Sequence, residues 1–227
     1  MGKRVLILSG GMDSVTLLYK LVKEVGRQSV YALTLNYGQR HVKEIEYSKW
    51  NCEHLGVNHL IIDITSIAPV LKGSALTDNL EVPDGNYADK NMKVTVVPNR
   101  NMIFLSLAIA YAVSLGAEEV YYGAHTGDHA IYPDCRPIFI EKMNAAAAIA
   151  NYEPVKIVTP FSTMDKGDIV KLGTKLGVPY EHTWTCYKGL EKACGTCGSC
   201  TERLEAFAKA ARKDPVEYLR HSNNTDD

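Results

Sequence analysis

The sequence of 227 residues lacks a long hydrophobic run, an excess of charge and a secretory leader. No apolar stretch approaches the roughly 18 residues that a transmembrane helix needs, so we expect no membrane-spanning segment. The formal net charge is −1, which provides no overall attraction to a nucleic acid. An apolar strand begins almost at the N-terminus, in place of the basic and apolar regions of a signal peptide. We therefore expect a cytoplasmic protein with no membrane or nucleic-acid partner.

Internal repeats and long linkers are also absent from the sequence, which argues against several independent domains. A chain of 227 residues suits one large domain with a small appendage. Its hydrophobic fraction of 46% is ordinary for a globular protein, so its core does not need disulfide bonds. We predict a main domain over residues 1–180, a small helical segment over 181–220 and a frayed end over 221–227.

Strand-like and helix-like segments alternate through the main domain, and this order predicts its fold. Successive βα units imply an open parallel sheet with helices on both faces. The helix over residues 102–115 is apolar almost all round, which predicts that it is buried. Residues 65–93 interrupt the alternation with prolines and glycines, as a lid or binding loop would. The expected strands cover residues 4–8, 30–36, 59–64, 94–97, 119–123 and 156–158, and the expected helices cover 13–25, 39–55, 102–115, 165–176 and 201–212, with an alanine-rich helix that ends at 150.

Residues 9–14 join the first expected strand to the first helix, and their sequence S-G-G-M-D-S predicts an anion site. The two glycines let the backbone approach a ligand closely, while the serine hydroxyls and the free N–H groups of the helix start can donate to phosphate. This is not a Walker loop, since no lysine lies between Lys3 and Lys20. The alternative is an ordinary glycine-rich turn in which Asp13 and Ser14 cap the helix.

Four of the six cysteines lie close together near the end of the chain, at Cys186, Cys194, Cys197 and Cys200. Four thiolates supply the tetrahedral donor set of a structural Zn²⁺ site. Disulfides are disfavoured in a reducing compartment, whereas an iron–sulfur cluster would use the same four ligands and a redox pair only two of them. We expect Zn²⁺ that holds the shape of this segment, because a four-cysteine site leaves no open position for chemistry.

Three polar groups fall where a nucleotide would lie at the carboxyl edge of the sheet. Residues 36–41 follow the second strand, so Tyr37 or a neighbouring backbone amide could contact an adenine. Arg100 opens a helix and can pair with phosphate or carboxylate, unless it is a surface charge. Lys166 begins a later helix and could reach the polyphosphate that a lysine-free loop leaves undercompensated. Its alternative role is that of a solvated lysine in a first helical turn.

The loop over residues 124–137 concentrates polar side chains after another expected strand, which predicts a ligand there. It carries two histidines, and each of them taken alone is more simply explained as a satisfied loop residue than as a catalytic group. The polar side chains of this loop are His125, Asp128, His129, Tyr132, Asp134 and Arg136.

These motifs, which cover nearly the whole chain, resemble those of the QueC family in the ATP-pyrophosphatase, or PP-loop, superfamily. The resemblance implies a Rossmann-like adenine-nucleotide α-hydrolase fold with a small zinc-binding C-terminal segment. It also implies conversion of 7-carboxy-7-deazaguanine and ammonia to the nitrile 7-cyano-7-deazaguanine in queuosine biosynthesis. ATP would be consumed through adenylated intermediates, with Mg²⁺ at the phosphates and Zn²⁺ in the tail.

The resemblance also assigns roles at the nucleotide site. Asp13, Ser14 and Lys166 are the expected catalytic residues, and Asp13 would hold part of the Mg²⁺ shell. The expected ATP-binding residues are Leu8, Ser9, Gly10, Gly11, Met12, Asp13, Ser14, Val15 and Thr16, together with Tyr37 and Arg100.

Three residues of the 124–137 loop are expected to bind the deazapurine. Asp128 would accept from the guanine-like N–H edge, Tyr132 would stack on the ring, and Arg136 would pair with the substrate carboxylate. A homodimer remains possible.

Two other classes of function stay open. The first is another PP-loop enzyme: a tRNA thiolase should carry a reactive cysteine and a basic appendage, and a glutamine-dependent amidating ligase should carry a glutaminase domain. Neither is evident in this sequence. The second is a non-enzymatic ATP-binding zinc module, which should have lost Asp13 or Ser14, and both are present.

Overall fold

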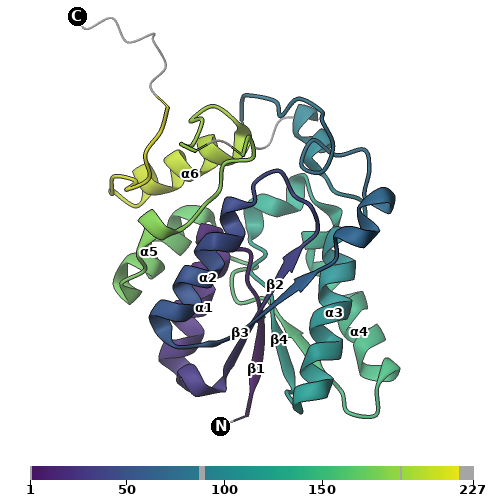
Figure 1. Ribbon diagram of the computed structural model, residues 1–227. Helices are drawn as coiled ribbons and strands as arrows, with labels where there is room; N and C mark the ends of the chain where they lie inside the picture. The colour runs from purple at the N-terminus through teal and green to yellow at the C-terminus, as the bar shows by residue number, and fades with distance from the viewer. Residues whose placement is uncertain (1, 87–89, 190, 220–227) are drawn as a thin grey trace, which may run out of the picture.

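The computed structural model describes residues 2–86, 90–189 and 191–219, and the predicted frayed end at 221–227 lies outside these ranges. In this described part of the chain, five parallel strands form one sheet in the order β3-β2-β1-β4-β5 (Figure 1). The predicted open parallel sheet is confirmed. The strands are β1 (Arg4–Ile7), β2 (Val30–Asn36), β3 (Asn58–Asp63), β4 (Glu119–Tyr121) and β5 (Lys156–Val158).

Helices cover both faces of the sheet, as the alternating pattern predicts. On one face α1 packs against α5, and on the other α3 and α4 pack against the sheet (Figure 1). The strand order reverses between β1 and β4, and the crevice at such a point is where open α/β sheets bind ligands. The helices are α1 (Met12–Val25), α2 (Lys43–Leu55), α3 (Arg100–Leu115), α4 (Pro137–Ala150), α5 (Lys166–Leu176) and α6 (Gly198–Lys209).

The predicted strand over residues 94–97 is wrong. Residues Lys90–Thr95 form a short 3₁₀ helix instead, and Thr95 is fully buried. The Thr95 hydroxyl donates to the Met92 carbonyl at 2.7 Å and also lies 3.0 Å from the Tyr132 hydroxyl. Because threonine side chains that bond to nearby carbonyls compete with strand pairing, the β-branched sequence here does not produce a sheet strand.

Helix α3 is buried on one face only, which corrects the expectation of a fully buried helix. Leu105, Ala108 and Ala112 pack against the sheet with no exposed surface. Met102 and Val113, which do not point to the sheet, remain 39% and 37% exposed.

The C-terminal segment is joined to the main domain through a shared core. Helix α6 packs against α5, and Phe207 is buried in the same hydrophobic cluster as α1 (Figure 1). Arg203, only 2% exposed, forms a two-pronged ion pair with Asp214 and donates to the Tyr180 carbonyl. Within the described residues, no helix is both long enough and apolar enough to cross a membrane.

Candidate functional site

A cavity opens at the carboxyl ends of β1, β2 and β4, where the strand order reverses. Residues 9 and 11–14 line it, together with the segment after β2, the start of α3 and the loop after β4. Thr185, Tyr187 and Ser199 of the C-terminal segment also line it. The cavity therefore brings together most of the polar motifs found in the sequence.

The loop over residues 9–14 is shaped for close approach. Gly10 has a φ of +93°, and a Cβ at this position would lie 1.9 Å from the Glu44 carbonyl oxygen of α2. Only glycine fits this position. The hydroxyls of Ser9 and Ser14 lie 2.9 Å apart, and the Gly11 amide donates to the Ser9 hydroxyl. Helix α1 starts at Met12, so its first N–H groups face the cavity as an anion site requires.

Lys166 supplies the positive charge beside this loop. Its ammonium lies 3.4 Å from the Asp13 carboxylate and 2.5 Å from the Glu202 carboxylate, and its side chain is 7% exposed. Burial alone would lower the pKa of Lys166, but Asp13 and Glu202 outweigh burial and hold the pKa above its ordinary value. The side chain therefore remains charged. The predicted proximity of Lys166 to the loop is what the structure shows.

His125 is buried between two carboxylates of the site. Its Nδ1 accepts a hydrogen bond from the Gly127 amide at 3.0 Å, so the neutral ring carries its proton on Nε2. Nε2 lies 3.8 Å from the Asp13 carboxylate and 3.6 Å from Asp128, and it has no hydrogen-bond partner among the described residues. The ring thus faces these two carboxylates from behind the cavity, which His125 itself does not line. The sequence alone favoured a satisfied loop residue.

Aromatic rings lie around a half-buried cation on the other side of the cavity. The Arg100 guanidinium lies 5.9 Å from the centre of the Tyr132 ring, and Tyr37 packs edge-on against Phe104. Burial raises the pKa values of Tyr37 and Tyr132, so these phenols stay neutral. Tyr187, from the C-terminal segment, contacts the Tyr132 hydroxyl at 3.1 Å. This part of the cavity suits a flat ring that carries an anionic group.

Three of the predicted site residues lie away from the cavity. Arg136 is exposed, does not line the cavity, and donates to the His129 carbonyl at 2.9 Å. Val15 is fully buried within the core, and the Thr16 hydroxyl donates to the Met12 carbonyl. Gly10 shapes the loop backbone. The remaining predicted nucleotide and substrate residues all line the cavity: Leu8, Ser9, Gly11, Met12, Asp13, Ser14, Tyr37, Arg100, Asp128, Tyr132 and Lys166.

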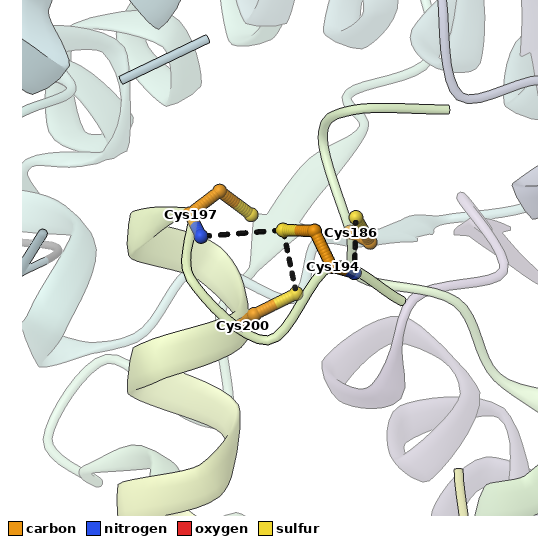
Figure 2. A group of neighbouring side chains, drawn as sticks. All are labelled: Cys186, Cys194, Cys197 and Cys200. Atoms are coloured by element: carbon orange, nitrogen blue, oxygen red, sulfur yellow. Dashed lines mark hydrogen bonds between the residues drawn. The ribbon is translucent and has the colours of Figure 1, made fainter. Parts of the chain in front are cut away.

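The four predicted cysteine ligands converge beside the start of α6 (Figure 2). Their sulfur atoms all lie within 4.8 Å of one another, and the Sγ atoms of Cys194 and Cys200 are 3.8 Å apart. A tetrahedral ion with bonds of about 2.3 Å to sulfur separates its ligands by about 3.8 Å. The donor set therefore fits a single metal ion, whereas a cubane cluster holds its four sulfurs farther apart.

Backbone amides add to the fit. The amides of Thr196 and Cys197 donate to the Cys194 sulfur, as Figure 2 shows for Cys197. The neighbouring thiols, Cys186 first, and the Cys197 amide lower the pKa of the Cys194 thiol, which favours the thiolate that a metal binds.

The residues that sequence reasoning missed come mostly from the C-terminal segment. Glu202 lies on α6, two residues after Cys200, and the Trp184 amide donates to the Gly10 carbonyl of the phosphate loop. No local pattern places these residues at the sheet edge, since the chain must fold back to bring them there. The predicted boundary at residue 180 does not divide the cavity, because residues on both sides of it line the cavity.

The fold and the loop define the class of protein as a PP-loop α/β protein. NMN synthetase from Francisella tularensis aligns with a TM-score of 0.53 at 15% identity, over 93% of this chain and 78% of that one. NH3-dependent NAD synthetase from Campylobacter jejuni aligns with a TM-score of 0.50 at 20% identity, over 79% of this chain and 66% of that one. U34-tRNA thiolase NcsA from Methanococcus maripaludis, solved with its [4Fe-4S] cluster, aligns with a TM-score of 0.51 at 17% identity, over 90% of this chain and 63% of that one. These similarities show a shared fold.

Sequence comparison identifies the family within this class. Residues 3–211 match the family model described as queuosine biosynthesis protein QueC. The 7-cyano-7-deazaguanine synthase of Psychromonas ingrahamii is 60% identical over 95% of this chain and 97% of its own length. The 7-cyano-7-deazaguanine synthase of Hahella chejuensis is 60% identical over 95% of this chain and 93% of its own length. The chain belongs to the QueC family.

Proposed function

We propose that the protein converts 7-carboxy-7-deazaguanine, ammonia and ATP to 7-cyano-7-deazaguanine. The observation that carries this proposal is the shared cavity, in which a phosphate loop with a buried lysine opens into an aromatic pocket with a half-buried arginine. A nucleotide and an aromatic carboxylate can therefore meet in one site. The names of the family relatives support the same reaction.

The chemistry of the product requires two activations. A carboxylate cannot lose oxide to ammonia, but its attack on the α-phosphorus of ATP releases pyrophosphate and forms an acyl-adenylate. Ammonia displaces AMP and a proton to give the amide. The amide oxygen then attacks a second ATP, again with loss of pyrophosphate, and elimination of AMP and a proton gives the nitrile. One phosphate loop can serve both rounds.

The residues around the loop would carry the nucleotide. The N–H groups at the start of α1 and the hydroxyls of Ser9 and Ser14 would bind the departing pyrophosphate, and Lys166 would balance its charge. Asp13 would hold Mg²⁺, since its buried Oδ1 atom has no hydrogen-bond partner among the described residues. When bound, Mg²⁺ supplies charge stabilisation at the phosphates.

The aromatic side of the cavity would bind the deazapurine. Arg100 is the cation that lines this side of the cavity, so we assign the substrate carboxylate to Arg100 in place of Arg136, which lies outside the cavity. Tyr132 would stack on the ring, and Asp128 would accept from its N–H edge. The four cysteines would hold Zn²⁺, and their spacing supports a single ion over the cluster of the thiolase neighbour.

Oxygen labelling tests this mechanism. With substrate that carries ¹⁸O in both carboxylate positions, mass spectrometry should find label in AMP from both rounds and about two AMP and two pyrophosphate per nitrile, with the amide as an intermediate. As a control, Asp13→Asn should slow turnover by about 10²-fold or more. Formation of ADP and labelled phosphate would place attack at the γ-phosphorus and reject the mechanism.

A further inference from the structure

We propose that Glu202 is a positioning residue that holds Lys166 in place at the phosphate site and thereby links the cysteine cluster to ATP binding. The proposal rests on the proposed function, because it assigns ATP to this site. Glu202 belongs to the C-terminal segment and lies on α6, outside the loop motifs of the main domain.

The contacts of Lys166 show what Glu202 does. The Lys166 ammonium lies 2.5 Å from Glu202 and 3.4 Å from Asp13, so Glu202 is the nearer of the two carboxylates. Without the charge of Glu202, the ammonium would turn to Asp13 and pair with it more closely. That pairing would occupy both groups that the nucleotide needs, since Asp13 would hold Mg²⁺ and Lys166 would bind phosphate. Glu202 therefore keeps Lys166 apart from Asp13.

The second carboxylate oxygen of Glu202 is also in close contact with the site. A Cβ at Gly127 would lie 2.6 Å from Glu202 Oε1, so the glycine allows the carboxylate to pack against the loop that carries His125. The Glu202 side chain is only 13% exposed. It is thus wedged between the start of α5 and the 3₁₀ turn at Thr126–Ala130, and its position is closely defined.

The cysteine cluster lies in part next to Glu202 on the same helix and would determine its position. Helix α6 begins at Gly198, directly after Cys197, and Cys200 lies in its first turn. Glu202 follows within one further turn of the helix. A metal held by the four cysteines would fix the start of α6 and hence the Glu202 carboxylate. A metal that performs no chemistry would therefore affect the phosphate site through the position of Glu202.

A double-mutant cycle tests whether Glu202 acts through Lys166. Glu202→Gln should raise the KM for ATP by about tenfold or more and leave the KM for the deazapurine, the metal content and the Tm close to those of the unaltered protein. In a Lys166→Met background, the same change should have no further effect on the KM for ATP. Glu205→Gln, on the exposed face of α6, is the matched control and should change nothing.

Calorimetric binding of a non-hydrolysable ATP analogue separates the two proposals. If the unaltered protein does not bind the analogue, the proposed function fails. If it binds the analogue and Glu202→Gln binds it equally well, the role of Glu202 is rejected. A Glu202→Gln effect that persists in the Lys166→Met background, or that comes with a lower Tm and loss of metal, would show a merely structural residue.

Discussion

Arg100 shows how strongly the setting of a single residue decides its role. Its guanidinium is enclosed by tyrosines, and Asp134 adds a negative charge nearby, so the cation persists although burial opposes it. Arg136 has the same side chain and lies in a loop rich in polar residues, but it is exposed and bonded to a backbone carbonyl. Of these two arginines, Arg100 lines the cavity and Arg136 does not.

We therefore expect different results from the same substitution at the two arginines. Arg100→Lys keeps a charge but loses the planar fork that matches a carboxylate, so the KM for 7-carboxy-7-deazaguanine should rise by about 10-fold to 100-fold. Arg136→Lys should change it less than twofold. Initial-rate kinetics with a Tm for each variant would check this. A larger effect at Arg136 would indicate that Arg136, and not Arg100, binds the substrate carboxylate.

Among the elements, α6 carries both part of the cysteine cluster and part of the hydrophobic core. Two of the four cysteines, Cys197 and Cys200, lie at its N-terminus, and its buried face carries Arg203 and Phe207. The helix thus connects the cysteine cluster with the hydrophobic core that it shares with α1 and α5.

Cys197→Ser should leave the protein with little bound metal and a melted C-terminal segment. Structural zinc contributes about 10–16 kcal/mol in small peptides, which matches or exceeds the whole margin of a typical domain. Metal analysis by mass spectrometry and proteolysis of the segment would measure the change, with Cys52→Ser as a control outside the cluster. Full metal content and normal melting with lost activity would instead indicate a catalytic cluster.

The stability of the whole molecule should fall in alkali, partly because of one buried thiol. Burial, and then the charge of Glu53, raise the pKa of Cys52 to about 12 from an ordinary value near 9. Between these two pH values the unfolded chain loses this proton and the folded chain keeps it. The contribution of Cys52 to stability should therefore be constant below about pH 9 and fall above it, by up to about 1.4 kcal/mol per pH unit.

Cys52→Ala isolates that contribution from those of the other buried acids. The variant should lose a fixed amount of stability at neutral pH from the small cavity, and its stability should then fall less steeply than that of the unaltered protein above about pH 9. Urea unfolding at several pH values gives both slopes. Equal slopes would show that Cys52 ionises alike in the folded and unfolded chains.

Much of the fold followed from the sequence because its signals are local. The alternating strands and helices, the S-G-G-M-D-S loop and the spacing of the four cysteines each depend on neighbours a few residues apart. The misassigned strand at residues 94–97 marks the limit of such signals. Its β-branched residues favour a strand, but the bond between Thr95 and Tyr132 is a tertiary contact that no local pattern contains.

The sequence by itself determined the parallel sheet, the glycine-rich loop at its edge and the grouping of the four cysteines, since these features depend on backbone periodicity and on spacings between nearby residues. The tertiary structure decided which side chains meet. It placed Arg100 in the cavity and Arg136 outside it, and it brought Glu202 to within 2.5 Å of Lys166 across 36 residues of chain. Such encounters depend on how the C-terminal segment folds back over the sheet, and packing across the whole molecule governs that path.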